Sequence, residues 1–133
     1  MSVKEYLHVL RRSLLVFTNG DAIRLARGRT TYTITDTFTS IAAYAFFSWS
    51  NDFALLHTVI IPNTITSVGH SAFYNCRVTI TLPNTITSIP SYMFRGCSSI
   101  TSITVPSYVS SIGALCFYNC CSLKSITISD RAQ

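Results

Sequence analysis

Charge is scarce in this sequence: its 133 residues include five Asp and Glu and ten Lys and Arg, so only 11% are charged. Apolar residues make up 48%. Disordered chains combine low hydrophobicity with high charge, so this composition excludes a disordered chain. The length suits one domain with a single continuous core.

Long hydrophobic runs are also missing. No apolar stretch approaches the roughly 18 residues that a membrane-spanning helix needs. The longest apolar run near the N-terminus, residues 14–17, follows Arg11 and Arg12 and is well short of the apolar segment of a signal peptide. We therefore expect no transmembrane segment and no classical signal peptide, and the residues themselves leave the localisation unknown.

The motifs of common enzymes are absent from the sequence. His8, His57 and His70 are isolated, and none lies in a His-Glu-x-x-His zinc motif. There is no Gly-rich phosphate loop and no Gly-x-Ser-x-Gly nucleophile motif, and the acidic residues are dispersed. We predict a protein that is not an enzyme and has no catalytic residue, cofactor or metal site.

Positive charge is concentrated at the N-terminus. Residues 1–30 hold six basic and two acidic residues, whereas the remaining chain holds four basic and three acidic ones. A nucleic-acid-binding protein usually carries its basic stripe on the folded body. The nearly neutral body therefore predicts no nucleic-acid partner.

The strongest signal in the sequence is internal repetition. Three segments align: IPNTITSVGHSAFYNC at 61–76, LPNTITSIPSYMFRGC at 82–97 and VPSYVSSIGALCFYNC at 105–120. One Pro, one Phe and one Cys recur in each copy with the same spacings; they are Pro62, Pro83 and Pro106; Phe73, Phe94 and Phe117; and Cys76, Cys97 and Cys120.

The array is imperfect at two places. A degenerate copy precedes the three, with residues 37–41 matching 64–68 and Phe46 matching Phe73, and an insertion around FSWSNDF follows it. Insertions in repeat arrays map to surface loops. The link between Cys76 and Pro83 is about two residues shorter than the next link, so this coil is expected to be tighter or distorted.

A short alternating segment lies before each proline. Alternation with β-branched residues predicts a strand with one buried face, and proline ends the ladder. The expected strands are at 32–34, 59–61, 80–82, 103–105 and 126–128. We expect Ala72-Phe73 and its equivalents to follow in a short helical turn that directs the ring inward. One coil cannot cover its own apolar face, so stacked coils with parallel strands are predicted.

The N-terminal residues 1–30 are predicted to cap the stack. Ser2 and Glu5 have the spacing of a helix capping box, and Asn19-Gly20 is a stop signal. The expected helix, at about 3–18, would carry an apolar stripe of Val3, Leu7, Leu10, Leu14 and Phe17. The alternative is a basic amphipathic helix on a membrane surface. Only SDRAQ follows Ile128, which predicts an uncapped last coil that could self-associate.

Four of the five cysteines are predicted to be structural. Three recur at one repeat position, where a small buried side chain is needed, and Cys116 aligns with Ala72 and Met93. Adjacent Cys120 and Cys121 lack zinc-ligand spacing. The odd count argues against a disulfide framework.

The repeated pattern, Ile-x-Leu/Val-Pro followed by Ile/Val-x-x-Ile and Ala-Phe-x-x-Cys, resembles the BspA-type leucine-rich repeat over residues 32–128. The resemblance implies an α/β repeat fold, a right-handed leucine-rich-repeat solenoid of about four repeats at 31–133. Members of the family are associated with adhesion, protein binding and host contact in certain bacteria and parasitic protists, which suggests the cell surface. The resemblance implies no catalytic residues.

Two surfaces are candidates for binding. The outward strand positions predict a flat, neutral, hydroxyl-rich ladder suited to a protein partner or a glycan: Thr33, Thr58, Ile60, Thr79, Thr81, Ser102, Thr104, Ser125 and Thr127. These residues are equally explained by the strand propensity of Thr. The aromatic residues of the inserted loop, Trp49 and Phe53, are a second candidate hot spot, and they are equally compatible with the core.

Overall fold

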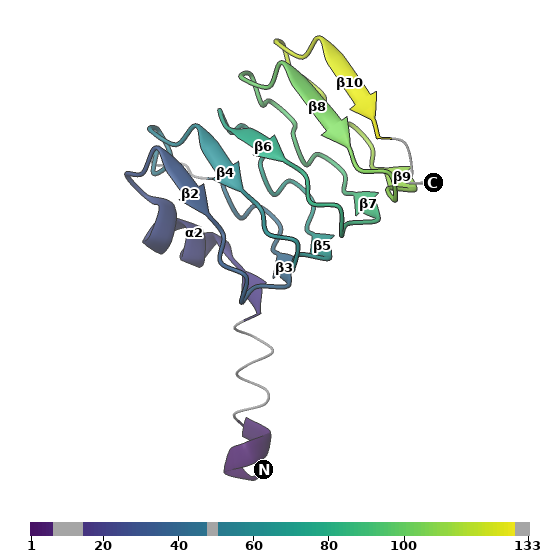
Figure 1. Ribbon diagram of the computed structural model, residues 1–133. Helices are drawn as coiled ribbons and strands as arrows, with labels where there is room; N and C mark the ends of the chain where they lie inside the picture. The colour runs from purple at the N-terminus through teal and green to yellow at the C-terminus, as the bar shows by residue number, and fades with distance from the viewer. Residues whose placement is uncertain (7–14, 48–50, 130–133) are drawn as a thin grey trace.

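A complete turn of the chain contains two short strands on different sides of the solenoid, and both recur along the molecule (Figure 1). We call the side with strands of three or four residues the long side and the side with strands of two residues the short side. The computed structural model describes residues 1–6, 15–47 and 51–129. The long-side strands are β2 (Thr31–Thr33), β4 (Thr58–Ile60), β6 (Thr79–Thr81), β8 (Ser102–Val105) and β10 (Ser125–Ile128). The short-side strands are β1 (Val16–Phe17), β3 (Ser40–Ile41), β5 (Ser67–Val68), β7 (Ser88–Ile89) and β9 (Ser111–Ile112). The chain is thus a parallel-strand solenoid of about five turns with little helix.

All strand pairs are parallel and in register from coil to coil. On the long side the pairing order is β2–β4–β6 and then β8–β10; on the short side it is β1–β3–β5 and then β7–β9. The coil that holds β6 and β7 therefore pairs backward on one side and forward on the other. This coil is the one reached through the short link, where the sequence predicted a distortion.

The predicted long-side strands are confirmed to within one residue, and their inward side chains are buried. Val59, Ile80 and Ile103 expose 1%, 7% and 4% of their surface. Strand pairing gives a residue at one repeat position the same neighbour type in each coil, as with Val59 beside Ile80. The short-side strands were not predicted, because two residues are too few to show an alternation.

The turns between the two sides form a third ladder of hydrogen bonds. The amides of Phe46, Phe73 and Phe94 donate to the carbonyls of Ala72, Met93 and Cys116 in the next coil, at 2.9, 3.1 and 3.0 Å. These segments are turns, so the predicted helical turns are wrong. The cause is a left-handed residue at one repeat position in each coil, which interrupts helical geometry: Tyr44, Ser71, Tyr92 and Leu115, with φ between 52° and 59°.

Five phenylalanine rings form the central column of the core. Phe17, Phe46, Phe73, Phe94 and Phe117 stack at successive centroid distances of 5.4, 5.0, 6.2 and 5.7 Å, with planes within 21° of parallel. Each fully buried ring contributes about 1.5–3 kcal/mol from apolar burial. Because each ring packs against the rings of the neighbouring coils, the stability of each coil depends on the coils beside it.

Glycine permits close approach of neighbouring coils at two places on the short side. A Cβ atom on Gly69 would overlap the backbone nitrogen of Ala43, and one on Gly113 would overlap that of Ser91. Glycine permits this approach because it has no side chain. The two glycines therefore allow these two contacts between neighbouring coils.

The N-terminal segment differs from the predicted helix over 3–18. Residues 3–6 are helical and Ser2 Oγ accepts from the Glu5 amide at 3.1 Å, but Val3 is 76% exposed, and Figure 1 draws this helix apart from the solenoid. The expected stripe residues Leu7, Leu10 and Leu14 lie outside the described residues. Phe17 is buried, but in strand β1.

A helix begins where the sequence predicted a helix end. Helix α2 (Asn19–Ala26) starts at Asn19-Gly20 because Thr18 and Asp21 form a reciprocal capping box, which competes successfully with the stop signal. Ala22 and Ala26 are buried, and Leu25 packs against the core. Helix α2 therefore lies at the N-terminal end of the solenoid.

The side chain of Asn19 replaces part of the missing preceding coil. Its Nδ2 donates to the carbonyls of Ala45 and Phe47 at 2.9 and 2.8 Å, and lies 3.3 Å from that of Tyr44. In the following coils, the carbonyls equivalent to those of Ala45 and Phe47 accept backbone amides, as Met93 accepts from Phe73. Asn19 thus satisfies the ladder at its first coil.

The C-terminal end of the solenoid is open. Ile112, Ile126 and Ile128 are 46%, 47% and 70% exposed. Residues at the same repeat positions one coil earlier, among them Ile103 and Val105, are no more than 4% exposed. The difference arises because no described coil covers the last one. Among the described residues, no helix is both long and apolar enough to cross a membrane.

Candidate binding surfaces

The strand residues singled out in the sequence lie on one face of the solenoid. In the first block, Thr58 pairs with Thr79, and Ile60 lies between Thr33 and Thr81. In the second block, Ser102 pairs with Ser125 and Thr104 with Thr127. Thr58 is half-buried, and the remaining eight are exposed. Strands β6 and β8 are not paired, so the two blocks are separate ladders.

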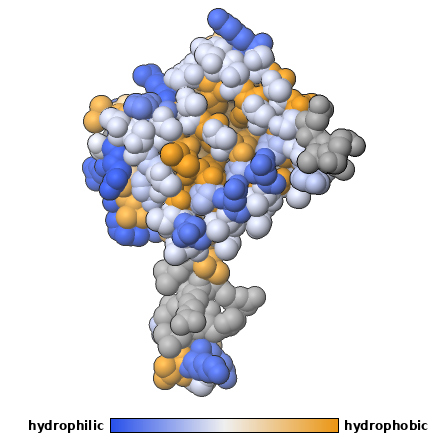
Figure 2. Space-filling view, in the orientation of Figure 1, coloured by the Kyte–Doolittle hydropathy of each residue, from blue (hydrophilic) through white to orange (hydrophobic). Residues whose placement is uncertain are grey.

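Sequence reasoning missed one member of this face. Thr31 pairs with Thr58 in the same row and is exposed. Its signal was the alternation at 31–33, which begins one residue earlier than expected. Figure 2 shows this side of the molecule as mostly pale residues of intermediate hydropathy, with apolar patches between them. Such a face can form hydrogen bonds through hydroxyl groups and contacts through side chains such as Ile60, which is 51% exposed.

Of the two candidate aromatic residues in the inserted loop, one lies in the described part of the chain. Trp49 lies outside the described residues. Phe53 is half-buried, and its ring lies 5.6 Å from that of Phe46, so it packs against the core. Asp52 in the same loop forms an ion pair with Arg27 at 3.0 Å, which ties the loop to the end of α2.

A hollow of about 680 Å³ lies between this loop and the next coil. Phe47, Asn51 and Phe53 line one side, and Tyr74 and Arg77 the other. The residues between Phe47 and Asn51 are outside the described part of the chain. We assign this hollow no ligand.

The recurring cysteines form a ladder of thiols that is buried at Cys76 and Cys97 and half-buried at Cys120. Cys76 and Cys97 donate from Sγ to the carbonyls of Phe46 and Phe73, at 3.1 and 3.0 Å, and Cys120 repeats the contact with Phe94 at 2.9 Å. All five cysteines are free, and Cys116 is buried as predicted. Each recurring thiol thus bonds to the ring residue of the preceding coil.

Burial changes the chemistry of these thiols. It raises the pKa of Cys97 to about 12 and that of Cys116 to about 11, and it raises the pKa of Cys76 well above the ordinary value. The reactive form of cysteine is the thiolate. The buried cysteines are therefore unsuited to nucleophilic chemistry at neutral pH.

Alkaline pH is expected to destabilise the fold through these thiols. Because the pKa of Cys97 is higher in the folded chain than its ordinary 9.0, its contribution to stability is complete below pH 9 and declines as the pH rises towards 12. The free energy of unfolding should decrease by about 1.4 kcal/mol per pH unit for each such thiol above pH 9. Urea unfolding of Cys97→Ala at several pH values above 9 should show a free energy of unfolding that falls less steeply with pH, by that amount per pH unit. An unchanged slope would contradict the assignment.

The histidines do not belong to a metal-binding cluster in the described part of the chain. His57 contacts the Thr58 hydroxyl at 3.0 Å, and His70 lies against the Tyr44 ring at 5.3 Å. Both are exposed, and His8 lies outside the described residues. Residues 1–6, 15–47 and 51–129 contain no group of three metal-binding side chains.

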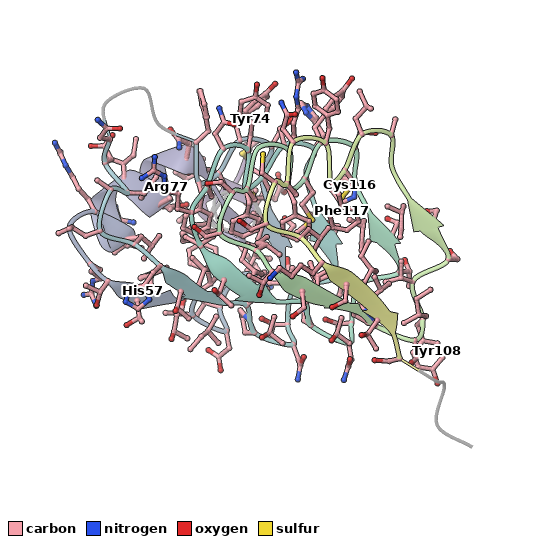
Figure 3. All side chains as sticks on the ribbon, turned by 90° about the horizontal axis from the view of Figure 1, so that it is seen from above. His57, Tyr74, Arg77, Tyr108, Cys116 and Phe117 are labelled. Carbon is pink, nitrogen blue, oxygen red and sulfur yellow. The ribbon has the colours of Figure 1, made fainter. Side chains whose placement is uncertain are left out.

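A row of side chains on the turn side was missed by sequence reasoning. The residue after each central phenylalanine occupies one repeat position: Phe47, Tyr74, Arg95 and Tyr118. Tyr74 points away from the ribbon, on the side opposite the long strands (Figure 3). Neighbouring Tyr44 and Tyr92 belong to the left-handed position of the same turns. The signal was an aromatic residue recurring directly after the phenylalanine.

Arg95 lies among three of these rings. Its Cζ atom is 5.6 Å from the ring centroid of Tyr74, 5.5 Å from that of Tyr92 and 5.2 Å from that of Tyr118. These distances fall within the range of cation–π attraction. Ion pairs within the described residues join Arg24 to Asp21 and Arg27 to Asp52, and neither includes Arg95.

Solved structures with the same fold come from three bacteria. A leucine-rich cell surface protein from Faecalibacterium prausnitzii has a TM-score of 0.61 and 26% identity over 77% of this chain and 32% of its own. A leucine-rich repeat protein from Eubacterium ventriosum gives 0.56 and 24% over 77% and 34%, and one from Bacteroides ovatus gives 0.53 and 23% over 73% and 33%. The chain thus spans about a third of each of these structures. A search of curated proteins gives no match.

A family comparison covers the same residues as the repeat. The sequence profile of the BspA type leucine-rich repeat region matches residues 28–133, in six copies. This span includes the long-side strands, the phenylalanine column from Phe46 onward and the cysteine ladder. The chain therefore belongs to the BspA-type leucine-rich repeat family.

Proposed function

We propose that this protein is a non-enzymatic module that binds a protein partner through the face of its long-side strands. The observation that supports this proposal is the register of the outward residues: hydroxyl groups repeat at fixed positions on two paired ladders. Paired strands hold side chains rigidly, which reduces the conformational entropy lost on binding. The near-neutral face favours a protein or a glycan over a polyanion.

Adhesion at a cell surface is the role we propose for this binding. The protein from Faecalibacterium prausnitzii is described as a leucine-rich cell surface protein, and some members of the family are associated with adhesion and host contact. A contact surface of this kind needs no catalytic group.

The test replaces Thr81, Thr104 and Thr127 by lysine. The three residues are exposed, so the fold should tolerate the change, whereas long charged side chains should prevent close contact. Partners captured by the unmodified chain from a surface extract should be lost. The control replaces Thr66, Thr87 and Ser110 by lysine. These residues are also exposed but precede the short-side strands, so this variant should retain the captured partners. Retention of every partner by the first variant would contradict the proposal.

Self-association through the last coil is the second candidate function. The exposed Ile126 and Ile128 belong to β10, whose outer edge no described strand covers. Exposed strand edges pair readily with other chains. Sedimentation across a concentration series should then show assemblies that grow with concentration and disappear in Ile126→Lys. A concentration-independent monomer would exclude this candidate.

We further propose that residues 1–30 act as the N-terminal cap and 31–133 as the repeat domain. Support comes from α2, whose Asn19 bonds to the first coil and whose Ala22 and Ala26 are buried. Open ends of repeat arrays require such capping for solubility. Removal of residues 1–30 should therefore cause aggregation, and a monomeric, folded fragment would contradict the assignment.

A further inference from the structure

The turn side of the solenoid carries a row of half-buried and exposed side chains that the proposed strand-face function does not use. At the repeat position after each central phenylalanine, Tyr74, Arg95 and Tyr118 occupy consecutive coils, so the Arg95 guanidinium lies between two tyrosine rings. A third ring, Tyr92, lies 5.5 Å away. We call these four residues, together with Tyr44 and Phe47, the aromatic row.

The row is held rigidly. The turn amides of Asn75 and Gly96 donate to the carbonyls of Arg95 and Tyr118 in the next coil, both at 2.8 Å. The rings also contact one another: Tyr44 lies 6.2 Å from Tyr74, and Phe47 lies 5.5 Å from Tyr74. Rigid aromatic side chains bind partners at low cost in conformational entropy.

The charge on Arg95 has no acidic partner within the described residues. The N–H donors of a guanidinium lie in its plane, and no ion pair among the described residues uses those of Arg95. The planar edge can therefore still donate two parallel hydrogen bonds to a carboxylate. Arg95 is half-buried, so the rings around it reduce competition from water.

We propose that the aromatic row is a docking surface for an acidic segment of a partner protein, with one carboxylate of that segment bound by Arg95. Charge complementarity supports this occupant, because Arg95 carries the positive charge of the row and neither ion pair among the described residues includes it. Tyrosine and arginine are the residues that most often dominate binding energy in protein interfaces. The row has a single cation, whereas a nucleic-acid site would need a basic stripe.

The mode of binding follows from the backbone. Because the turn amides are already bonded between coils, the partner cannot add a strand here. Recognition must come from side chains, which means the Arg95 edge and the tyrosine rings. Leu115 and Tyr118, which are 52% and 48% exposed, extend the apolar contact towards the last coil.

The test uses a random copolymer of L-glutamate and L-tyrosine as the acidic polypeptide and polygalacturonate as an acidic glycan. Binding to the full chain is measured by calorimetry at physiological salt, which screens distant charges. The copolymer should bind, and Arg95→Gln should weaken binding about tenfold, because a charge-assisted bidentate contact is lost. Arg95→Lys should also weaken it, by about fivefold, because an ammonium group lacks the planar fork.

The matched control is Arg29→Gln, which removes the same charge from an exposed position at the N-terminal end. It should change the affinity less than about twofold. Thermal unfolding of each variant confirms that the fold is retained. Equal weakening by Arg29→Gln and Arg95→Gln would show non-specific attraction and overturn the proposal. Arg95-dependent binding of polygalacturonate alone would overturn it in favour of a glycan site.

This surface is independent of the strand face. Lysine at Thr81, Thr104 and Thr127 should leave copolymer binding unchanged, since these residues lie on the long-side strands. Loss of copolymer binding in that variant would place the acidic site on the strand face and contradict the assignment to Arg95. Failure of the strand-face proposal leaves the copolymer test unaffected.

Discussion

Phe73→Ala is expected to lower the free energy of unfolding by about 3–5 kcal/mol, which is the usual cost of deleting a buried ring. Phe73 is 0% exposed and lies at the centre of the column, 5.0 Å from the Phe46 ring and 6.2 Å from the Phe94 ring. Domains are stable by only about 5–15 kcal/mol. A large part of the total should therefore be lost in urea unfolding.

The position of the change in the array predicts a second effect. Because coils interact only with their neighbours, a gap at Phe73 should separate the two halves and broaden the unfolding transition. Phe73→Leu fills most of the space and should cost less than about 1.5 kcal/mol. Phe117→Ala, at the half-buried end of the column, should cost less than Phe73→Ala. Equal costs at the two positions would show that the column is not a continuous core.

Asn19→Asp is expected to be the most damaging change at a partly exposed position. The substitution replaces an amide that donates to the carbonyls of Ala45 and Phe47 by a carboxylate facing the same oxygens. Unsatisfied polar groups cost about 1–3 kcal/mol each, and repulsion adds to this. We expect a loss of about 3 kcal/mol or more at pH 7, measured by urea unfolding.

Two comparisons separate capping of the first coil from an effect on α2 itself. Alanine favours helix and aspartate favours the first turn of a helix, so neither change should weaken α2. Asn19→Ala should cost less than Asn19→Asp, because it introduces no repulsion. The facing carbonyls should raise the pKa of the introduced carboxyl, so the aspartate variant should regain stability as the pH falls through that pKa. A variant as stable as the wild type would contradict the capping role.

The regular part of the fold could be predicted because one side-chain type recurs at each repeat position. The alternation around Val59, Ile80 and Ile103 identified the long-side strands, and the recurring phenylalanine and cysteine identified the buried column. Burial of Cys116 followed from its alignment with Ala72 and Met93. Each of these residues has the same environment in every coil, so three copies provide three independent observations.

The N-terminal segment could not be predicted in the same way, because it occurs once. Its apolar stripe suggested a helix through Phe17. Phe17 lies instead in β1, where it pairs with Ile41 of β3 and stacks on Phe46. Tertiary packing outweighed the local helical pattern. The reciprocal bonds of Thr18 and Asp21 then started a helix at the expected stop signal.

The aromatic row escaped prediction for a different reason. Its members differ in type, from Phe47 through Tyr74 and Arg95 to Tyr118, so the position reads as variable and exposed. Only the third ladder of turn hydrogen bonds brings these residues into one row. The hydroxyl face was accessible to sequence reasoning because Ser and Thr alternate directly with the buried strand residues.

Amide hydrogen exchange tests the stacked solenoid most directly. The turn amides of Phe46, Phe73 and Phe94 donate to the next coil, so they should exchange as slowly as the amide of Thr79, which donates to the His57 carbonyl at 2.8 Å. The amides of Leu115 and Phe117, in the last such turn, have no acceptor among the described residues and should exchange rapidly. Rapid exchange at Phe46, Phe73 and Phe94 would contradict the stacking of coils on which the fold and both proposed surfaces depend.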